Sequence, residues 1–198
     1  MKGAGEREGA PATASAPEER RAPLKLGPMP LTRAMMTVDE AIVRAPLATV
    51  FAIVRDVEHW PVHLPHYRWV RIHQRTTDGG GVLEMSANRP FGPLNWPTWW
   101  LSQMQVLDAD TRTPAIRFRH TGGITQGMEV EWRMTARDDG TRVTLVHAWD
   151  GPDWPVFGVF AATAIIGPVF VHGIASRTLS GLSRVAERAA GTPGTAPA

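Results

Sequence analysis

The sequence predicts an α+β domain in which a curved antiparallel sheet of seven strands wraps round a long C-terminal helix. Three observations lead to this fold class. Segments of strand-like alternation follow one another, separated by turns rich in Gly, Pro and Asp. Two short helical segments lie after the first strand. A long, mostly apolar segment, Trp154 to Arg188, follows the last strand and has the pattern of one helix.

The predicted domain covers residues 37–189. Residues 1–36 are rich in Pro, Ala, Gly, Glu and Arg and lack hydrophobic periodicity, so we expect a disordered tail there. Residues 190–198 are expected to form a second disordered tail. The Met35-Met36 pair leaves open whether residues 1–34 belong to the natural protein.

Composition narrows the function classes. The net charge is +2, and the basic residues are scattered among 19 acidic ones, which argues against a nucleic-acid-binding surface. The chain has no Cys, so it has neither a disulfide framework nor a thiolate nucleophile. Residues 1–34 lack the apolar core of a secretory signal. We therefore expect a cytoplasmic protein.

The first elements are a strand over residues 37–44 and a helix over residues 47–55. Apolar residues with the spacing of one helical face occur in this helix at Leu47, Val50, Phe51 and Val54. A second short helix is expected over residues 57–60, with Asp56 as its cap and Pro61 at its end.

Six further strands are predicted over residues 68–75, 82–88, 98–107, 114–120, 127–136 and 142–149. Residues 89–97, RPFGPLNWP, are expected to form an irregular loop. The final helix has an apolar first half that is long enough to span a membrane, but its Gly and Pro residues favour a buried helix. Pro168 predicts a kink in this helix beside the entrance to a pocket, with His172 one turn beyond it.

Alternation along the strands predicts which side chains face inward. Charged residues occupy one face of the later strands and are expected to face solvent: Arg117, Arg119, Glu129, Glu131 and Arg133. The opposite face, directed inward, contains Trp100, Ser102, Met104, Phe118, His120, Met128, Val130, Trp132, His147 and Trp149. The two inward histidines are either core residues with satisfied hydrogen bonds or acid/base groups of a pocket.

The opening motif A-P-x-x-x-V-F-x-x-V-x-D-x-x-x-W-P, from Ala45 to Pro61, resembles the START-related polyketide cyclase/dehydrase (SRPBCC) superfamily. This resemblance covers about residues 37–189 and implies the helix-grip fold. Within the superfamily the chain is most similar to single-domain aromatic polyketide aromatase/cyclases. Their pocket pattern is matched by Trp60, Tyr67, Trp100, Ser102 and Trp132.

Departures from that family pattern imply a more apolar pocket. Met104 and Phe118 stand where the cyclases have arginines, and His172 lies one position from the cyclase histidine on the last helix. His172 and Ser102 are the candidate catalytic residues if the protein is an enzyme. The histidines at 59, 63 and 66 suggest a metal site by number, but prolines interrupt their spacing and favour solvent-facing loop histidines.

The expected function is binding of a polyketide-like or polycyclic aromatic molecule in a cavity of about 300–1,000 Å³ lined by aromatic side chains. Two alternatives remain open: the Trp residues simply fill the core, or the protein is a non-enzymatic carrier of a lipid or quinone. Cyclisation with dehydration is the expected reaction if chemistry occurs. Besides the ligand, the expected partner is an acyl carrier or a quinone-related protein. No cofactor or metal is expected.

Overall fold

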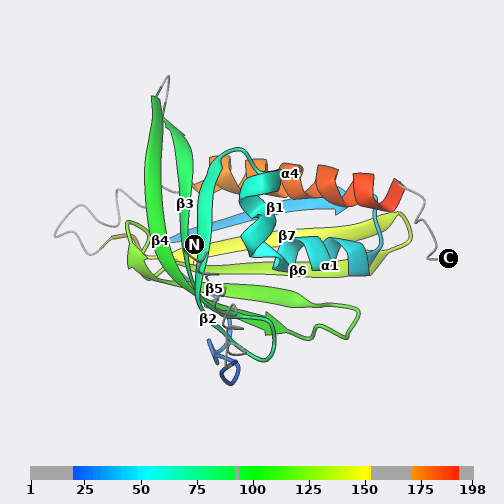
Figure 1. Cartoon of the computed structure of the whole chain (residues 1–198), viewed down its shortest axis with the longest axis horizontal. Coiled ribbons are helices and arrows are strands. Elements are labelled where there is room, and N and C mark those ends of the chain that lie inside the picture. The colour runs from blue at the N-terminus through cyan, green and yellow to red at the C-terminus, as the bar shows by residue number, and fades with distance from the viewer. Residues whose placement is uncertain (1–19, 92–93, 153–170, 192–198) are drawn as a thin grey trace, which may run out of the picture.

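The structure, a computed structural model, describes residues 20–91, 94–152 and 171–191 and shows the predicted α+β helix-grip architecture (Figure 1). Seven antiparallel strands form one sheet in the order β1-β7-β6-β5-β4-β3-β2. Consecutive strands from β2 to β7 pair as a meander, and β1 pairs with β7. The sheet curves round the C-terminal helix α4, which packs against β1 and the first helix, α1.

The strands have the bounds Met35–Val43 (β1), Tyr67–Arg75 (β2), Gly81–Phe91 (β3), Leu94–Leu107 (β4), Ala115–Gly123 (β5), Glu129–Arg137 (β6) and Gly140–Trp149 (β7). The helical elements are α1 (Leu47–Arg55), the 3₁₀ turn η1 (Val57–His59), α2 (Trp60–His63) and α4 (His172–Gly191). Helix α1 has the predicted bounds, and the residues of its predicted apolar face that are fully buried are Val50, Phe51 and Val54.

The predicted irregular loop over residues 89–97 is wrong. β3 and β4 continue through it as a paired hairpin, with Asn88 opposite Pro97 and Phe91 opposite Leu94 (Figure 1). Pairing of β4 with β5 begins only at Trp100, so β4 has a single neighbour at Pro97. A proline, which lacks an N–H, is compatible with a strand that has one open edge. The prolines therefore mark a protruding hairpin rather than a break in the strands.

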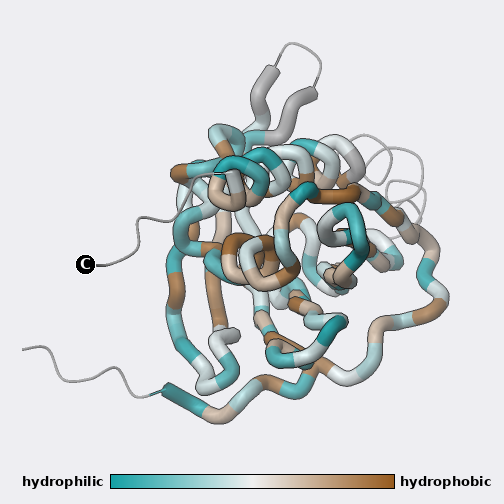
Figure 2. Tube along the Cα trace, turned by 90° about the vertical axis from the view of Figure 1, so that its right-hand side faces the viewer, coloured by the Kyte–Doolittle hydropathy of each residue, from teal (hydrophilic) through white to brown (hydrophobic). Residues whose placement is uncertain are grey.

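Helix α4 places an apolar side against the sheet. Its buried residues include Ala175, Leu179, Leu182 and Ala186, at the spacing of one helical face. The hydropathy colouring in Figure 2 shows apolar segments alternating with polar ones along the chain.

The predicted Pro168 kink and most of the apolar first half of the helix lie outside the described residues. Within the described ranges, no helix combines the length and apolar composition of a membrane span.

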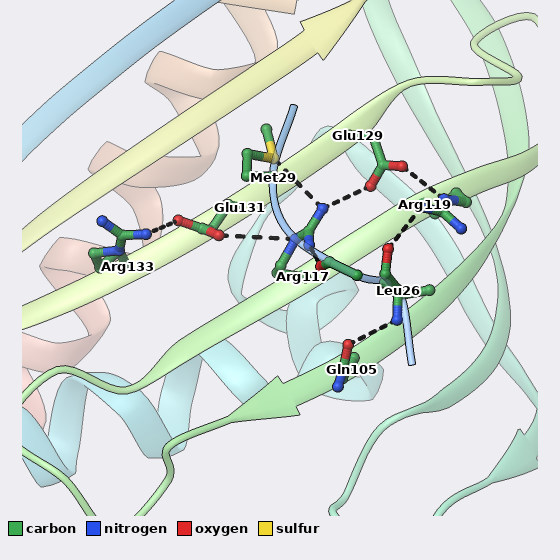
Figure 3. Close-up of polar contacts among 9 residues, drawn as sticks. Leu26, Met29, Gln105, Arg117, Arg119, Glu129, Glu131 and Arg133 are labelled. Atoms are coloured by element: carbon green, nitrogen blue, oxygen red, sulfur yellow. Dashed lines mark hydrogen bonds and ion pairs between the residues drawn. The ribbon is translucent and has the colours of Figure 1, made fainter. Parts of the chain in front are cut away.

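Residues 20–34 differ from the expected disorder, because they form contacts with the sheet, and the part around Leu26 and Met29 crosses its outer face (Figure 3). Arg21 bridges to Thr76, and Leu26 is buried, with its N–H donating to Gln105 Oε1 at 3.0 Å. Further along, the N–H of Ala34 donates to a carboxylate oxygen of Asp150 at 3.0 Å. This hydrogen bond is the main reason why the pKa of Asp150 is lowered. The contacts that order this segment come from residues distant in sequence.

The same segment explains a second difference from expectation. Arg117, Glu129 and Glu131 were expected to face solvent, yet all three are buried. Arg117 donates to Glu129 at 2.8 Å and to the carbonyl oxygen of Gly27, and Glu129 also accepts from Arg119 at 2.6 Å (Figure 3). The alternation correctly predicts the outer face. Residues 26–29 then cover that face, and the buried charges form ion pairs and hydrogen bonds with one another.

Candidate ligand-binding site

A cavity lies between the concave face of the sheet and α4. Every strand from β2 to β7 contributes at least one side chain to its wall, as do α2 and the start of α4. Among the described residues, the lining consists of Trp60, Tyr67, Met85, Trp100, Phe118, His120, Met128, Val130, Trp132, Leu145, His147, Val171, Ile174, Ala175 and Thr178. Nine of the predicted ligand-binding residues are in this set: strand alternation predicted seven of them, and the family resemblance predicted Trp60 and Tyr67.

Trp60 is at the centre of the aromatic side chains. Its ring centroid lies 5.3 Å from that of Tyr67, 5.8 Å from that of Trp132 and 6.4 Å from that of Phe118. The first two pairs are edge-to-face, a favoured arrangement for aromatic rings. Tyr67 continues the cluster to Trp100, whose ring stacks on His120 with 5.8 Å between centroids. The rings therefore form one connected cluster.

Packing of these rings leaves little free space. The cavity that the described residues surround has a volume of about 60 Å³, well below the predicted range. A water molecule needs roughly 10–15 Å³ of such volume, whereas a cavity that admits benzene has about 150 Å³. The Trp residues thus fill much of the core, as one of the two alternatives expected, and they also line what space remains. An aromatic ligand would require some of the rings to move.

Polar groups in the wall are few, and most are paired. His120 Nδ1 lies 2.7 Å from Thr125 Oγ1, and His147 Nδ1 lies 3.4 Å from Thr37 Oγ1. The exception is Trp60: its Nε1–H is buried and has no hydrogen-bond partner among the described residues. A buried donor without a partner costs about 1–3 kcal/mol. This N–H can therefore donate to an acceptor of a bound molecule.

Three predicted site residues do not line the cavity. Ser102 is fully buried within β4, opposite His120, and its hydroxyl has no partner among the described residues. Met104 is buried opposite Phe118. Trp149 is buried and donates from Nε1 to the carbonyl oxygen of Gln126 at 2.8 Å. Their inward orientation was inferred from alternation, and Ser102 was also assigned from the family pattern. Neither indicates how far along a strand the cavity extends.

His172, the predicted catalytic residue of the last helix, is the first residue of α4, and its side chain lies outside those the structure describes.

Six lining residues were not predicted: Met85, Leu145, Val171, Ile174, Ala175 and Thr178. Alternation in β7 does place Leu145 on the same face as His147, and alternation in β3 could have identified Met85. The four on or beside α4 depend on how the helix is rotated over the sheet.

The three clustered histidines have separate environments. The exposed His59 is 2.8 Å from Asp56, and this hydrogen bond raises the pKa of His59. His63 is exposed. His66 is half-buried rather than solvent-facing, and its Nε2 lies 3.0 Å from Thr178 Oγ1. Burial, and secondarily the charge of Arg177, lowers the pKa of His66 to about 4, so its ring is neutral at pH 7.

Comparisons with known proteins agree with this architecture. A family profile described as polyketide cyclase / dehydrase and lipid transport matches residues 43–168. The structure is similar to TTHA0849 from Thermus thermophilus, with a TM-score of 0.65 and 19% identity over 80% of this chain and 100% of that one. It is also similar to the ZhuI aromatase/cyclase from Streptomyces sp. R1128, with a TM-score of 0.58 and 19% identity over 78% and 94% of the two chains.

A START superfamily protein from Mycobacterium smegmatis matches with a TM-score of 0.55 and 18% identity, over 78% of this chain and 96% of that one. At these identities the solved structures establish the shared fold. A comparison with curated proteins finds no match.

Proposed function

The chain belongs to the polyketide cyclase / dehydrase and lipid transport family, and from this premise we propose that it binds and carries an apolar aromatic or polyketide-like small molecule. The single observation that supports this most directly is the buried, unpartnered Nε1–H of Trp60 within a wall of aromatic side chains. Such a wall offers flat apolar surfaces, and the N–H offers one donor to a hydroxyl or carbonyl oxygen.

Binding in this proposal proceeds by rearrangement of the aromatic cluster, because the cavity of about 60 Å³ is too small for a fused ring system. Movement of Trp60 would open the cluster most, because Trp60 is the ring that joins the others. It belongs to α2, a helix of only four residues, and contacts three other aromatic rings. Each aromatic pair contributes roughly 0.5–1.5 kcal/mol. Burial of about 200 Å² of apolar ligand surface contributes about 5 kcal/mol and would offset the loss of those pairs.

A cyclase reaction is the second candidate, and the two imidazoles in the wall favour it. His120 and His147 both line the cavity, where a histidine can transfer protons to and from a β-keto chain. Ser102, the other predicted catalytic residue, is outside the lining, so the support for this candidate comes from the two histidines. The predominantly apolar wall, with Phe118 at a position where the sequence resemblance predicts arginine, favours carriage over catalysis.

Isothermal titration calorimetry with 1-naphthol and larger polycyclic phenols tests the binding proposal. We expect micromolar affinity and an approximately fivefold loss in Trp60→Phe, which keeps an aromatic ring but removes a hydrogen bond of about 1 kcal/mol. The matched control is Trp99→Phe, because Trp99 is about half exposed and lies outside the cavity lining. It should bind like the wild type. Absence of binding to every phenol of the panel would contradict the proposal.

Incubation of the protein with a linear poly-β-ketone separates the two candidates. Recovery of the unchanged ketone in complex with the protein, by native mass spectrometry, supports carriage. Formation of a dehydrated cyclic product supports the cyclase, and this product should then be lost in His120→Gln or His147→Gln.

A further inference from the structure

A second concave surface lies outside the cavity, between residues 63–66 and the exposed side of α4. This groove, of about 410 Å³, is lined by groups that suit an anion: His63, His66, Ser176, Arg177, Ser180 and Arg184. None of the described residues that line it is acidic. The groove therefore combines two guanidinium groups with imidazole and hydroxyl groups. One of these hydroxyls, Ser176 Oγ, donates to Asp39 Oδ1 at 3.2 Å, and that carboxylate is outside the lining.

Helix periodicity explains why these groups share one surface. Arg177, Ser180 and Arg184 follow one another at i, i+3 and i+7, so they lie along one side of α4. Gly181 lies on the same side of α4. Its lack of a side chain allows the connection between α2 and β2, which contains Leu64, to approach the helix closely. A Cβ on Gly181 would lie 2.2 Å from Leu64 Cδ2, and Leu64 is fully buried. A larger residue at 181 would push this wall away from the helix.

The two arginines differ from those on the outer face of the sheet. Arg117, Arg119 and Arg133 each form an ion pair with a glutamate. Arg177 and Arg184 form no ion pair with any residue that the structure describes, and both are exposed. The positive charge of Arg177 extends to His66, whose pKa it lowers in addition to the effect of burial. A bound anion would be attracted by both guanidinium groups.

One hydrogen-bonded pair links the wall of the groove to the wall of the cavity. Thr178 lines the cavity, His66 lines the groove, and Thr178 Oγ1 is 3.0 Å from His66 Nε2. A ligand with an apolar ring system and an anionic group could thus place one part in each, once the aromatic cluster has opened.

We propose that the groove binds a phosphate group, with Arg177 and Arg184 as its ligands, and that the natural ligand is an amphipathic phosphate ester whose apolar part occupies the neighbouring cavity. The second part rests on the proposed function. The phosphate-binding groove does not, since its residues are separate from the aromatic wall.

Calorimetry with three probes separates these parts. 1-Naphthol tests the cavity, inorganic phosphate tests the groove, and 1-naphthyl phosphate tests both together. We expect 1-naphthyl phosphate to bind at least tenfold more tightly than 1-naphthol, with an advantage that decreases as NaCl increases. Arg177→Gln and Arg184→Gln should each remove most of that advantage and leave the affinity for 1-naphthol unchanged.

The control is Arg142→Gln, a substitution of an exposed arginine on β7 that lies outside both linings. It should bind all three probes like the wild type. Amide NMR spectra provide a second measurement, because inorganic phosphate should shift the signals of Ser180 and Gly181 in the wild type and not in Arg177→Gln. This readout does not depend on binding of the naphthyl ring.

The outcomes are distinct. Equal affinities for 1-naphthol and 1-naphthyl phosphate, or an advantage that both glutamine variants retain, would overturn the phosphate site. Binding of inorganic phosphate in the groove without any binding of 1-naphthol would support the site and contradict the proposed function. Binding to vesicles that contain phosphatidic acid, with no binding of 1-naphthyl phosphate, would overturn the small-ligand proposal and identify a membrane surface as the source of the phosphate.

Discussion

His66 and Thr178 are 112 positions apart in the chain, yet His66 Nε2 lies 3.0 Å from Thr178 Oγ1. This hydrogen bond joins the connection before β2 to helix α4. It also links the wall of an apolar cavity to the wall of a basic groove. A change in the charge of His66 would affect both surfaces, so its ionisation is a direct probe of the site.

We predict that stability decreases as the pH falls from about 6.5 to about 4, because His66 gains a proton in the unfolded chain but not in the folded protein. The pKa of His66 is about 4 in the folded protein and close to 6.5 in the unfolded chain. In this window the unfolded state binds the proton more readily, so protonation favours unfolding. Urea denaturation at several pH values should show a smaller decrease in His66→Gln than in the wild type; equal decreases would contradict the assignment.

Inorganic phosphate should raise the pKa of His66. An anion beside Arg177 and Arg184 would reduce the positive potential that helps to lower this pKa. The ring signals of His66 in NMR titrations with and without phosphate measure the shift. His59 is the internal control, because Asp56 dominates its pKa and it lies outside the groove lining. A phosphate effect of equal size on both histidines would indicate only ionic strength.

Trp132→Ala should lower the free energy of unfolding by about 3–5 kcal/mol, the usual cost of removing a large buried aromatic side chain. Trp132 is 3% exposed and its ring is 5.8 Å from that of Trp60. Trp99→Ala is the control: Trp99 is 51% exposed, and its loss should cost less than about 1 kcal/mol. Urea denaturation followed by circular dichroism measures both, and similar losses in the two variants would show that Trp132 is not part of a packed core.

Glu129→Gln should lower the free energy of unfolding by about 3 kcal/mol. Glu129 accepts from both Arg117 and Arg119, and Arg117 is almost completely buried, so the substitution leaves a buried guanidinium with one fewer charged partner. Glu58→Gln, which removes an exposed ion pair with Arg75, should change stability by less than about 1 kcal/mol. Chemical denaturation compares the two, and equal effects would contradict the buried network.

Leu26→Ala should destabilise the protein by about 2 kcal/mol, because it removes most of a buried leucine side chain from the outer face of the sheet. Leu31→Ala is a matched control within the same segment, since Leu31 is 89% exposed. Thermal and urea unfolding measure the difference. If both variants match the wild type, residues 20–34 contribute little to stability.

The sequence by itself determined the order of the elements and the orientation of most side chains. Both depend on local patterns: Leu47 to Arg55 repeats apolar residues at helical spacing, and β5 to β7 alternate with a period of two. For this reason alternation alone places Phe118, His120, Trp132 and His147 on the inner face of the sheet, and the cavity lining contains all four.

Only the tertiary structure decided which of those side chains meet and what covers them. Arg117 is buried by residues about 90 positions earlier in the chain, in a segment without periodicity. The volume left beside Trp60 depends on how side chains from different strands and helices pack, and the groove depends on Gly181 meeting Leu64. Contacts between distant segments leave no repeating pattern in the sequence. Local periodicity can therefore predict a face but not its neighbour.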